Sequence, residues 1–220
     1  MKPQSERTPM RLAVFASGSG TNFQAILNAI EAGMLSAQVV LCVSDRATAG
    51  ALERARSRNI PIAILPPNEF PTETAFGEAL LAVLKQHAVD FVALAGYLKK
   101  IPDNVVAAYR NRILNVHPSL LPAFGGPGMY GRRVHEAVLN YGVRWTGATV
   151  HLVDEKYDHG PIVLQEPVPV YPDDTPETLA ARVLKVEHRL YPEALQLFAE
   201  GRIVIDGRHV RILPPLSTTP

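Results

Sequence analysis

The chain has 220 residues, of which 47% are hydrophobic and 20% are charged, and its formal net charge at pH 7 is +1. This length and composition predict a globular protein of one large domain, and the near-neutral charge excludes a general attraction for nucleic acid or acidic membranes. The single cysteine, Cys42, excludes an internal disulfide and a cysteine zinc cluster. We expect a cytoplasmic protein, because no apolar run approaches the roughly 20 residues that span a bilayer and no signal peptide is visible.

The first half of the chain alternates apolar runs with segments of helical periodicity. Strands are expected where the residues are mostly apolar, at 11–16, 38–44, 60–65 and 91–94. Helices are expected where apolar residues recur every three or four positions, at 23–30, 49–58 and 76–84. Strands separated by helices predict a parallel sheet with right-handed crossovers and with helices on both faces.

The second half of the chain has a different pattern. Strands are expected at 112–116, 146–153 and 162–170, and a helix at 134–140. A long helix follows within 175–201, in which Pro192 is a candidate interruption, and a hairpin pairs 202–205 with 209–212. The predicted fold class is therefore α/β, a Rossmann-like, open and mostly parallel twisted sheet with mixed strands and a hairpin in its C-terminal part.

A glycine-containing loop, SGSGTN at residues 17–22, lies between the first strand and the first helix. There the backbone N–H groups of a helix N-terminus can bind a phosphate, and Thr21 and Asn22 can add side-chain hydrogen bonds. Phe23 occupies the place of the third glycine of a dinucleotide fingerprint, which disfavours a nicotinamide or flavin site. The alternative is a tight turn with a helix cap, so this glycine loop alone does not identify a reaction.

The strongest chemical signal is the run NVHPSLLP at residues 115–122, at the end of a predicted strand. Because side chains alternate along a strand, Asn115 and His117 point the same way, where an amide and a protonated imidazole could both donate to a substrate carbonyl. Asp158, on the loop between the next two strands, could support the imidazolium and move a proton. His151 leads toward that loop, and Ser119 is a weak nucleophile candidate without a hydrolase elbow. A core histidine and a turn-forming aspartate are the structural alternatives.

Several separated segments together resemble the phosphoribosylglycinamide formyltransferases, also called glycinamide ribonucleotide transformylases, which are folate-dependent formyltransferases. The segments are ASGSGTN at 16–22, LAGY at 94–97, NVHPSLLP at 115–122, TGATVH at 146–151, DHGP at 158–161, EH at 187–188 and YP at 191–192. Their span implies a single formyltransferase domain at 11–213, with a flexible N-terminus at 1–10 and a tail at 214–220. Within it, 11–111 would be the phosphate-binding half and 112–213 the catalytic and folate-binding half.

The resemblance also implies the reaction, in which 10-formyltetrahydrofolate is the formyl donor and the amine of glycinamide ribonucleotide is the acceptor, in purine synthesis and without a metal. The implied contacts of the acceptor are Gly20, Thr21, Asn22 and Glu187. The implied contacts of the folate are Leu98, Lys99, Lys100, Ile101 and Asn115. No nucleic acid or membrane partner is implied, and the chain would be a monomer or a homodimer.

Asn115, His117 and Asp158 would form the catalytic set, supported by His151 and Ser119. Asn115 and protonated His117 would stabilise the charge that develops on the formyl oxygen, while Asp158 would favour the charged ring and help remove the amine proton. The glycine-rich loop at 125–131 is a candidate for closure over the substrate. Two positions depart from the family, with Lys99 in a segment where members often have Arg and Glu73 where another folate-contacting Arg is usual.

Three other functions remain as alternatives. Formyltetrahydrofolate deformylase, a hydrolase, uses similar Asn, His and Asp residues, but carries an N-terminal regulatory domain for which we expect no room before residue 11. Methionyl-tRNA formyltransferase has a further C-terminal tRNA-binding domain, and the charge of +1 offers no basic surface for tRNA. A non-catalytic nucleotide-binding module would explain the glycine loop and leave the Asn115, His117 and Asp158 set without a purpose.

Overall fold

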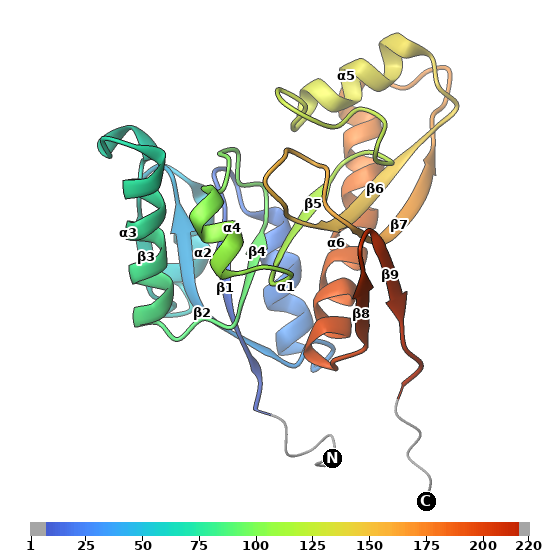
Figure 1. Ribbon diagram of the computed structural model, residues 1–220. Helices are drawn as coiled ribbons and strands as arrows, with labels where there is room; N and C mark the ends of the chain where they lie inside the picture. Colours follow the sequence, from blue (N-terminus) through green and yellow to red (C-terminus); the bar gives the residue numbers. More distant parts are fainter. Residues whose placement is uncertain (1–7, 216–220) are drawn as a thin grey trace, which may run out of the picture.

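The computed structural model describes residues 8–215, so most of the expected flexible N-terminus and C-terminal tail lies outside the described residues. One sheet of seven strands has the order β3-β2-β1-β4-β5-β6-β7 (Figure 1). Its strands are β1 (Met10–Phe15), β2 (Ala37–Ser44), β3 (Ile62–Ile64), β4 (Phe91–Leu94), β5 (Ile113–His117), β6 (Trp145–Leu152) and β7 (Ile162–Pro169). Strands β1 to β5 pair in parallel, and β6 and β7 are antiparallel. The predicted Rossmann-like, mostly parallel α/β class is confirmed.

Helices cover both faces of the sheet, as Figure 1 shows. Those on one face are α1 (Thr21–Glu31), α2 (Gly50–Arg56), α5 (Arg132–Tyr141) and α6 (Pro176–Ala199). Those on the other face are α3 (Glu73–Gln86) and α4 (Asp103–Ala108), next to the short 3-10 helix η2 (Pro67–Glu69). The C-terminal hairpin β8 (Ile203–Asp206) and β9 (His209–Ile212) forms a separate sheet, confirming the predicted hairpin.

Alternation along the strands explains the two helical layers. In β1, Leu12 and Val14 belong to the core under α1 and α6, whereas Ala13 and Phe15 belong to the core under α3 and α4. All four are fully buried, as expected for a strand covered on both faces. Cys42 in β2 is also fully buried, and burial raises its pKa to about 12, so this thiol is protonated near neutral pH.

Strand order creates a crevice at the carboxyl ends of β1 and β4. From β1 the chain proceeds through β2 to β3 on one side, and β4 then joins the other side of β1. At such a reversal, open α/β sheets bind their ligands. The N–H of Ser17 donates to the carbonyl of Gly96 over 3.0 Å, and the N–H of Leu98 donates to Ser17 Oγ over 2.9 Å. The glycine loop is thereby joined to the segment that follows β4.

Helix α6 is continuous through Pro192, where an interruption was a candidate. Proline cannot donate the helical hydrogen bond at this position, but Tyr191, Ala194 and Leu195 are fully buried around it and fix the helix by packing. The Tyr191 hydroxyl lies 3.1 Å from the carbonyl oxygen of Leu94 and 3.0 Å from that of Leu114. Because Leu94 is the last residue of β4 and Leu114 lies in β5, this hydroxyl fixes α6 against two neighbouring strands.

Candidate active site

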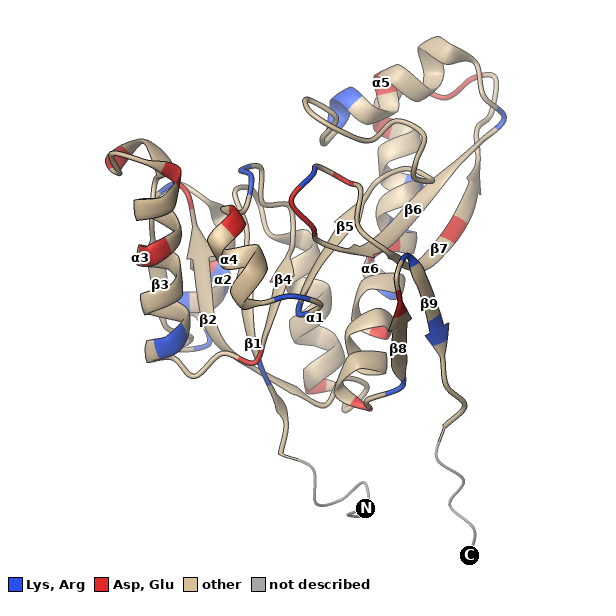
Figure 2. Ribbon diagram, viewed as in Figure 1, with Lys and Arg blue, Asp and Glu red and all other residues tan. Residues whose placement is uncertain are grey.

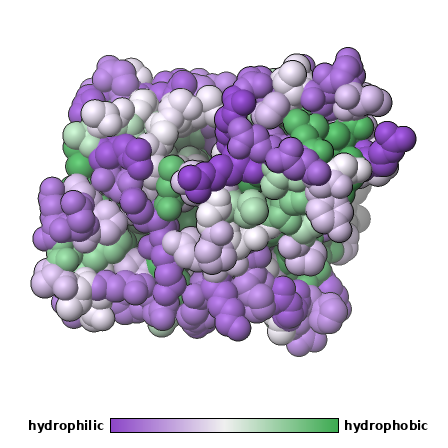
Figure 3. Space-filling model, turned by 90° about the horizontal axis from the view of Figure 1, so that it is seen from above, coloured by the Kyte–Doolittle hydropathy of each residue, from purple (hydrophilic) through white to green (hydrophobic). Residues whose placement is uncertain are grey.

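A cavity of about 670 Å³ occupies the crevice, among the loops after β4 and β5, the loop between β6 and β7, and helices α5 and α6. Figure 3 looks onto this side of the molecule and shows hydrophobic side chains set among hydrophilic ones. Most of the predicted site residues line the cavity, namely Asn22, Leu98, Lys99, Lys100, Ile101, Asn115, His117, His151, Asp158 and Glu187. The fold thus brings together residues that are up to 165 positions apart in sequence, as the Asn22–Glu187 contact shows.

Three predicted residues are not among those that line this cavity in the described part of the chain. Gly20 is buried at the start of α1 with φ +72°, and a Cβ there would lie 2.8 Å from the Ala51 side chain. Thr21 instead lines a second cavity between α1 and α6. Ser119 is fully buried and its hydroxyl donates to the carbonyl of Ala123 over 2.6 Å, which shapes the turn after β5.

His117 ends β5, and its side chain is only 4% exposed. Its Nε2 lies 2.9 Å from the carbonyl oxygen of Phe124, which can only accept, so Nε2 carries the hydrogen and a neutral ring leaves Nδ1 as an acceptor. Nδ1 lies 3.6 Å from Asp158 Oδ2. Burial lowers the pKa of His117 below its ordinary value, and the charge of Asp158 opposes this only in part. A neutral ring is therefore favoured at pH 7 in the ligand-free protein.

Asp158 joins the two histidines of the cavity. Its Oδ2 accepts the N–H of Gly126 over 2.9 Å, and its Oδ1 lies 3.6 Å from His151 Nε2. Burial raises the pKa of Asp158, but the His151 ring, the charge of His117 and the Gly126 N–H together lower it below its ordinary value. The Asp158 side chain is therefore a carboxylate near neutral pH, and it can stabilise a positive charge on the His117 ring.

The amide of Asn115 is oriented by His151, which lies directly opposite it in the antiparallel β5–β6 pair. His151 Nδ1 lies 2.8 Å from the carbonyl oxygen of Leu152 and so carries the hydrogen, which leaves Nε2 to accept from Asn115 Nδ2 over 3.2 Å. The amide group has a second hydrogen on Nδ2. The cavity therefore contains a fixed hydrogen-bond donor, Asn115 Nδ2, and a hydrogen-bond acceptor, Nδ1 of the neutral His117 ring.

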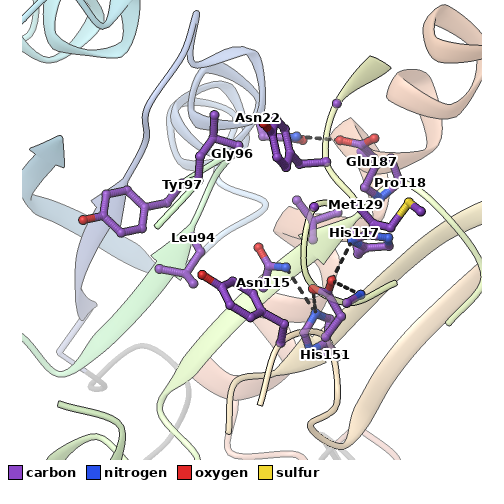
Figure 4. A pocket seen from close by; sticks show the side chains of 18 of the residues that line it. Asn22, Leu94, Gly96, Tyr97, Asn115, His117, Pro118, Met129, His151 and Glu187 are labelled. Carbon is purple, nitrogen blue, oxygen red and sulfur yellow. Dashed lines mark hydrogen bonds and ion pairs between the residues drawn. The ribbon is translucent and has the colours of Figure 1, made fainter. Parts of the chain in front are cut away.

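Asn22 and Glu187 form the polar end of the cavity, separated in Figure 4 from the centre around His117 by Pro118 and Met129. Asn22 Nδ2 donates to Glu187 Oε2 over 2.7 Å, and both residues are 8% exposed. Burial raises the pKa of Glu187, and the hydrogen bond from Asn22 opposes the rise. Within residues 8–215, the first turn of α1 has no side-chain cap and no acidic residue, so its N–H groups suit an anion.

His135, on helix α5, is a functional candidate that the sequence pattern alone does not indicate. It is 4% exposed, lines the main cavity, and its Nδ1 is buried with no partner among the described residues. Burial, with a smaller effect of His117, lowers its pKa to about 4. Its place in the first turns of α5, directly after the glycine-rich loop, is the signal that could have identified it.

Acidification is expected to destabilise the fold through His135. The pKa of His135 is about 4 in the folded protein, compared with 6.5 for a histidine without these surroundings. Between these two pH values the unfolded state therefore binds a proton that the folded state does not. The free energy of unfolding should thus fall as pH drops through this window, with about 3 kcal/mol attributable to His135 by about pH 4. Denaturant unfolding at about pH 7.5 and about pH 4.5 measures this loss, which should be smaller in His135→Gln. Equal losses in both proteins would contradict the prediction.

Between residues 8 and 215, no group of three or more His, Cys, Asp and Glu side chains is arranged to hold a metal ion. The helices in the same range are all too short or too polar to cross a bilayer.

Fold and cavity together define an α/β protein in which Asn115, His117 and Asp158 line one crevice at the carboxyl ends of the strands. Comparison with known families matches residues 10–195 to the formyl transferase family. The chain is 48% identical over 194 residues to the chloroplastic phosphoribosylglycinamide formyltransferase of Arabidopsis thaliana. The match covers 88% of this chain and 66% of that protein, so the chain spans just under two thirds of this plant relative. It is 39% identical over 186 residues to phosphoribosylglycinamide formyltransferase of Bacillus subtilis (strain 168), covering 84% of this chain and 93% of that one.

Solved structures agree with these sequence relationships. Glycinamide ribonucleotide transformylase 1 from Symbiobacterium toebii matches with a TM-score of 0.89 and 47% identity, covering 94% of this chain and 95% of that one. The chain belongs to the formyl transferase family, among the phosphoribosylglycinamide formyltransferases. A formyltetrahydrofolate deformylase from Pseudomonas syringae matches with a TM-score of 0.84 but only 24% identity, over 94% of this chain and 66% of that one, and shows a common fold alone.

Proposed function

We propose that this protein transfers a formyl group from 10-formyltetrahydrofolate to the amine of glycinamide ribonucleotide, giving N-formylglycinamide ribonucleotide and tetrahydrofolate. The observation that carries the proposal is a single cavity with three regions. In Figure 4, Asn115 and His117 lie near both a polar end at Asn22 and Glu187 and a more apolar part at Leu94 and Tyr97, and Asp158 lines the same cavity. Two substrates bound in these two parts could therefore meet at the same centre.

The donor is assigned to the side of the cavity formed by Leu94, Tyr97 and the segment 98–101. Apolar side chains here suit the flat ring system of a folate. Lys100 binds the carboxylates of Glu73 and Asp103 over 3.1 and 2.8 Å. Glu73, where the family resemblance leads one to expect an arginine, thus has a local partner, and the exposed Lys99 also lines the cavity.

The acceptor is assigned to the end of the cavity next to α1. The uncapped first turn of α1 would receive the phosphate through backbone N–H groups, including that of Thr21 whose side chain points into the second cavity. Asn22 and the carboxyl group of Glu187 would hold polar groups of the ribonucleotide. This arrangement would leave the amine near His117.

Asn115 and His117 have different tasks in the proposed reaction. The acceptor nitrogen bonds to the formyl carbon while Asn115 Nδ2 donates to the formyl oxygen, on which negative charge develops. Neutral His117 takes the proton of the attacking nitrogen at Nδ1, and Asp158 stabilises the resulting imidazolium. His117 then returns this proton to the folate nitrogen as its bond to the formyl carbon breaks. This differs from the expectation of a protonated resting His117, because burial lowers the pKa of that ring.

A turnover assay separates transfer from hydrolysis. Tetrahydrofolate release from 10-formyltetrahydrofolate is measured with and without glycinamide ribonucleotide. A transferase releases it only when the amine is present, together with an equal amount of formylated ribonucleotide. Release at the same rate without the amine would identify a deformylase instead.

Replacing Asn22 by alanine is expected to raise the KM for glycinamide ribonucleotide roughly tenfold or more and that for the folate less than twofold. The substitution removes the amide that holds Glu187 and that would donate to the charged ribonucleotide, and a hydrogen bond to a charged group contributes about 1.5–3 kcal/mol. Steady-state kinetics with each substrate varied in turn provide the measurement. Asn28→Ala, an exposed asparagine of the same helix, is the matched control. Equal increases in both KM values would count against an acceptor site at Asn22.

A further inference from the structure

The C-terminal hairpin contacts the loop that carries Asp158. Arg208 lies in the turn between β8 and β9, and its Nη2 donates to the carbonyl oxygen of His159 over 2.7 Å. Its Nη1 lies 3.4 and 3.3 Å from Nδ1 and Nε2 of the His159 ring, so the guanidinium rests against that ring. In Figure 2 the blue turn of the hairpin accordingly lies close to the loop between β6 and β7.

His159 extends this contact across the loop. Its Nδ1 donates to Asp154 Oδ2 over 2.7 Å, and Asp154 Oδ1 accepts the N–H of Lys156 over 2.9 Å. Arg208, His159 and Asp154 therefore form one chain of contacts from the hairpin to the beginning of the loop. Asp154 lines the main cavity, but none of the three is assigned a contact with the formyl group in the proposed reaction, so we expect their effect to be indirect.

Asp158 needs such support from its surroundings. Its φ of +51° is in the left-handed region, which non-glycine residues rarely adopt unless neighbouring contacts hold them there. On its C-terminal side, Gly160 presses against the carbonyl of Leu152, where a Cβ would be only 1.9 Å from the oxygen. On the same side, the carbonyl of His159 is held by Arg208. The His159–Gly160 peptide, one residue after Asp158, is thus fixed from outside the cavity.

We infer that Arg208 is a positioning residue, which holds the loop at 154–160 so that the Asp158 carboxylate meets His117 and the Gly126 N–H. The inference rests on the proposed function for its catalytic readout. Arg208 and His159 are exposed, and exposed contacts of this kind add little to global stability. Loss of Arg208 should therefore change the geometry of one loop more than it changes the stability of the fold.

The experiment compares Arg208→Ala with Arg211→Ala, which removes another exposed arginine from the same hairpin. Arg208→Ala is expected to lower kcat roughly tenfold with both KM values within about twofold of wild type. Arg211→Ala should leave kcat unchanged, and Arg208→Lys, which can still donate to the His159 carbonyl, should recover most of it. An unchanged kcat in Arg208→Ala, or an equal loss in Arg211→Ala, would overturn the inference.

A double variant tests whether Arg208 acts through Asp158. If it does, adding Arg208→Ala to Asp158→Asn should change kcat less than about twofold, because the group being positioned is already absent. The same tenfold loss in both backgrounds would mean a general structural role and would refute the positioning role.

Amide hydrogen exchange separates failure of this inference from failure of the proposed function. Residues 154–160 should exchange faster in Arg208→Ala than in wild type or Arg211→Ala, whatever reaction the protein catalyses. Unchanged exchange would overturn the inference even in an active transferase. An inactive wild-type protein with faster exchange in Arg208→Ala would refute the proposed function and leave the anchoring of the loop supported.

Discussion

Replacing His117 by alanine is expected to lower kcat by about 10²–10⁴ and to leave the affinity for glycinamide ribonucleotide nearly intact. His117 is the one cavity histidine with its Nε2 fixed on a carbonyl, that of Phe124, and its Nδ1 facing a carboxylate. Its removal deletes the group that takes the proton from the attacking nitrogen. The acceptor end at Asn22 and Glu187 remains, so binding should persist.

Single-turnover kinetics and equilibrium binding of the ribonucleotide check the two parts of this expectation. His188→Ala is the matched control, because burial also lowers the pKa of His188 but this histidine lines the second cavity. The control should keep kcat within about threefold of wild type, as expected for a residue away from the reacting atoms. An unchanged kcat in His117→Ala would contradict a catalytic role for this ring.

Replacing Asp158 by asparagine is expected to lower kcat by about 10² or more and to move the acid limb of the pH–rate profile to lower pH. The proposed active form has a neutral His117, so kcat/KM should fall as pH decreases through the pKa of that ring. Burial lowers this pKa from 6.5 and the charge of Asp158 raises it. Without the carboxylate the pKa falls further, and the imidazolium formed during turnover loses its stabilisation.

The pH profile distinguishes the two possible roles of His117. A resting imidazolium that donates to the formyl oxygen would give activity that declines as pH rises through the same pKa, and Asp158→Asn would shift that decline. Glu155→Gln, which removes an exposed carboxylate of the same loop that pairs with Arg110, should leave both the limb and kcat in place. An acid limb that stays fixed or moves to higher pH in Asp158→Asn would refute the proposed proton transfer.

The central strands β1, β2 and β4 could be predicted because each contains a run of apolar residues that is buried on both faces of the sheet. Helix α4 was missed, since its six residues are too few to show a helical period. Pro192 was wrongly considered a candidate interruption, because packing around Tyr191 and Leu195 outweighs the missing hydrogen bond. Local patterns thus identified elements well, and the errors arose where length or tertiary packing decided the outcome.

For the site, residue types could be predicted better than contacts. Asn115 and His117 face one cavity because they are two positions apart on a strand, which sequence shows directly. That Asp158 lies between His117 and His151 depends on how the β6–β7 loop folds back, which no local pattern contains. The inward direction of His135 and the outward direction of the Thr21 side chain likewise depend on helix packing. The catalytic roles themselves stay predictions until the variants are measured.

The pairing of Asn115 with His151 across β5 and β6 has a consequence for how this sequence can change. Because strand residues alternate between faces, inserting or deleting one residue within β6 would turn His151 to the opposite side of the sheet. The turn at 142–144 that precedes β6 is under no such constraint. Length variation among related chains should therefore accumulate in that turn and be excluded from β6 between Trp145 and His151.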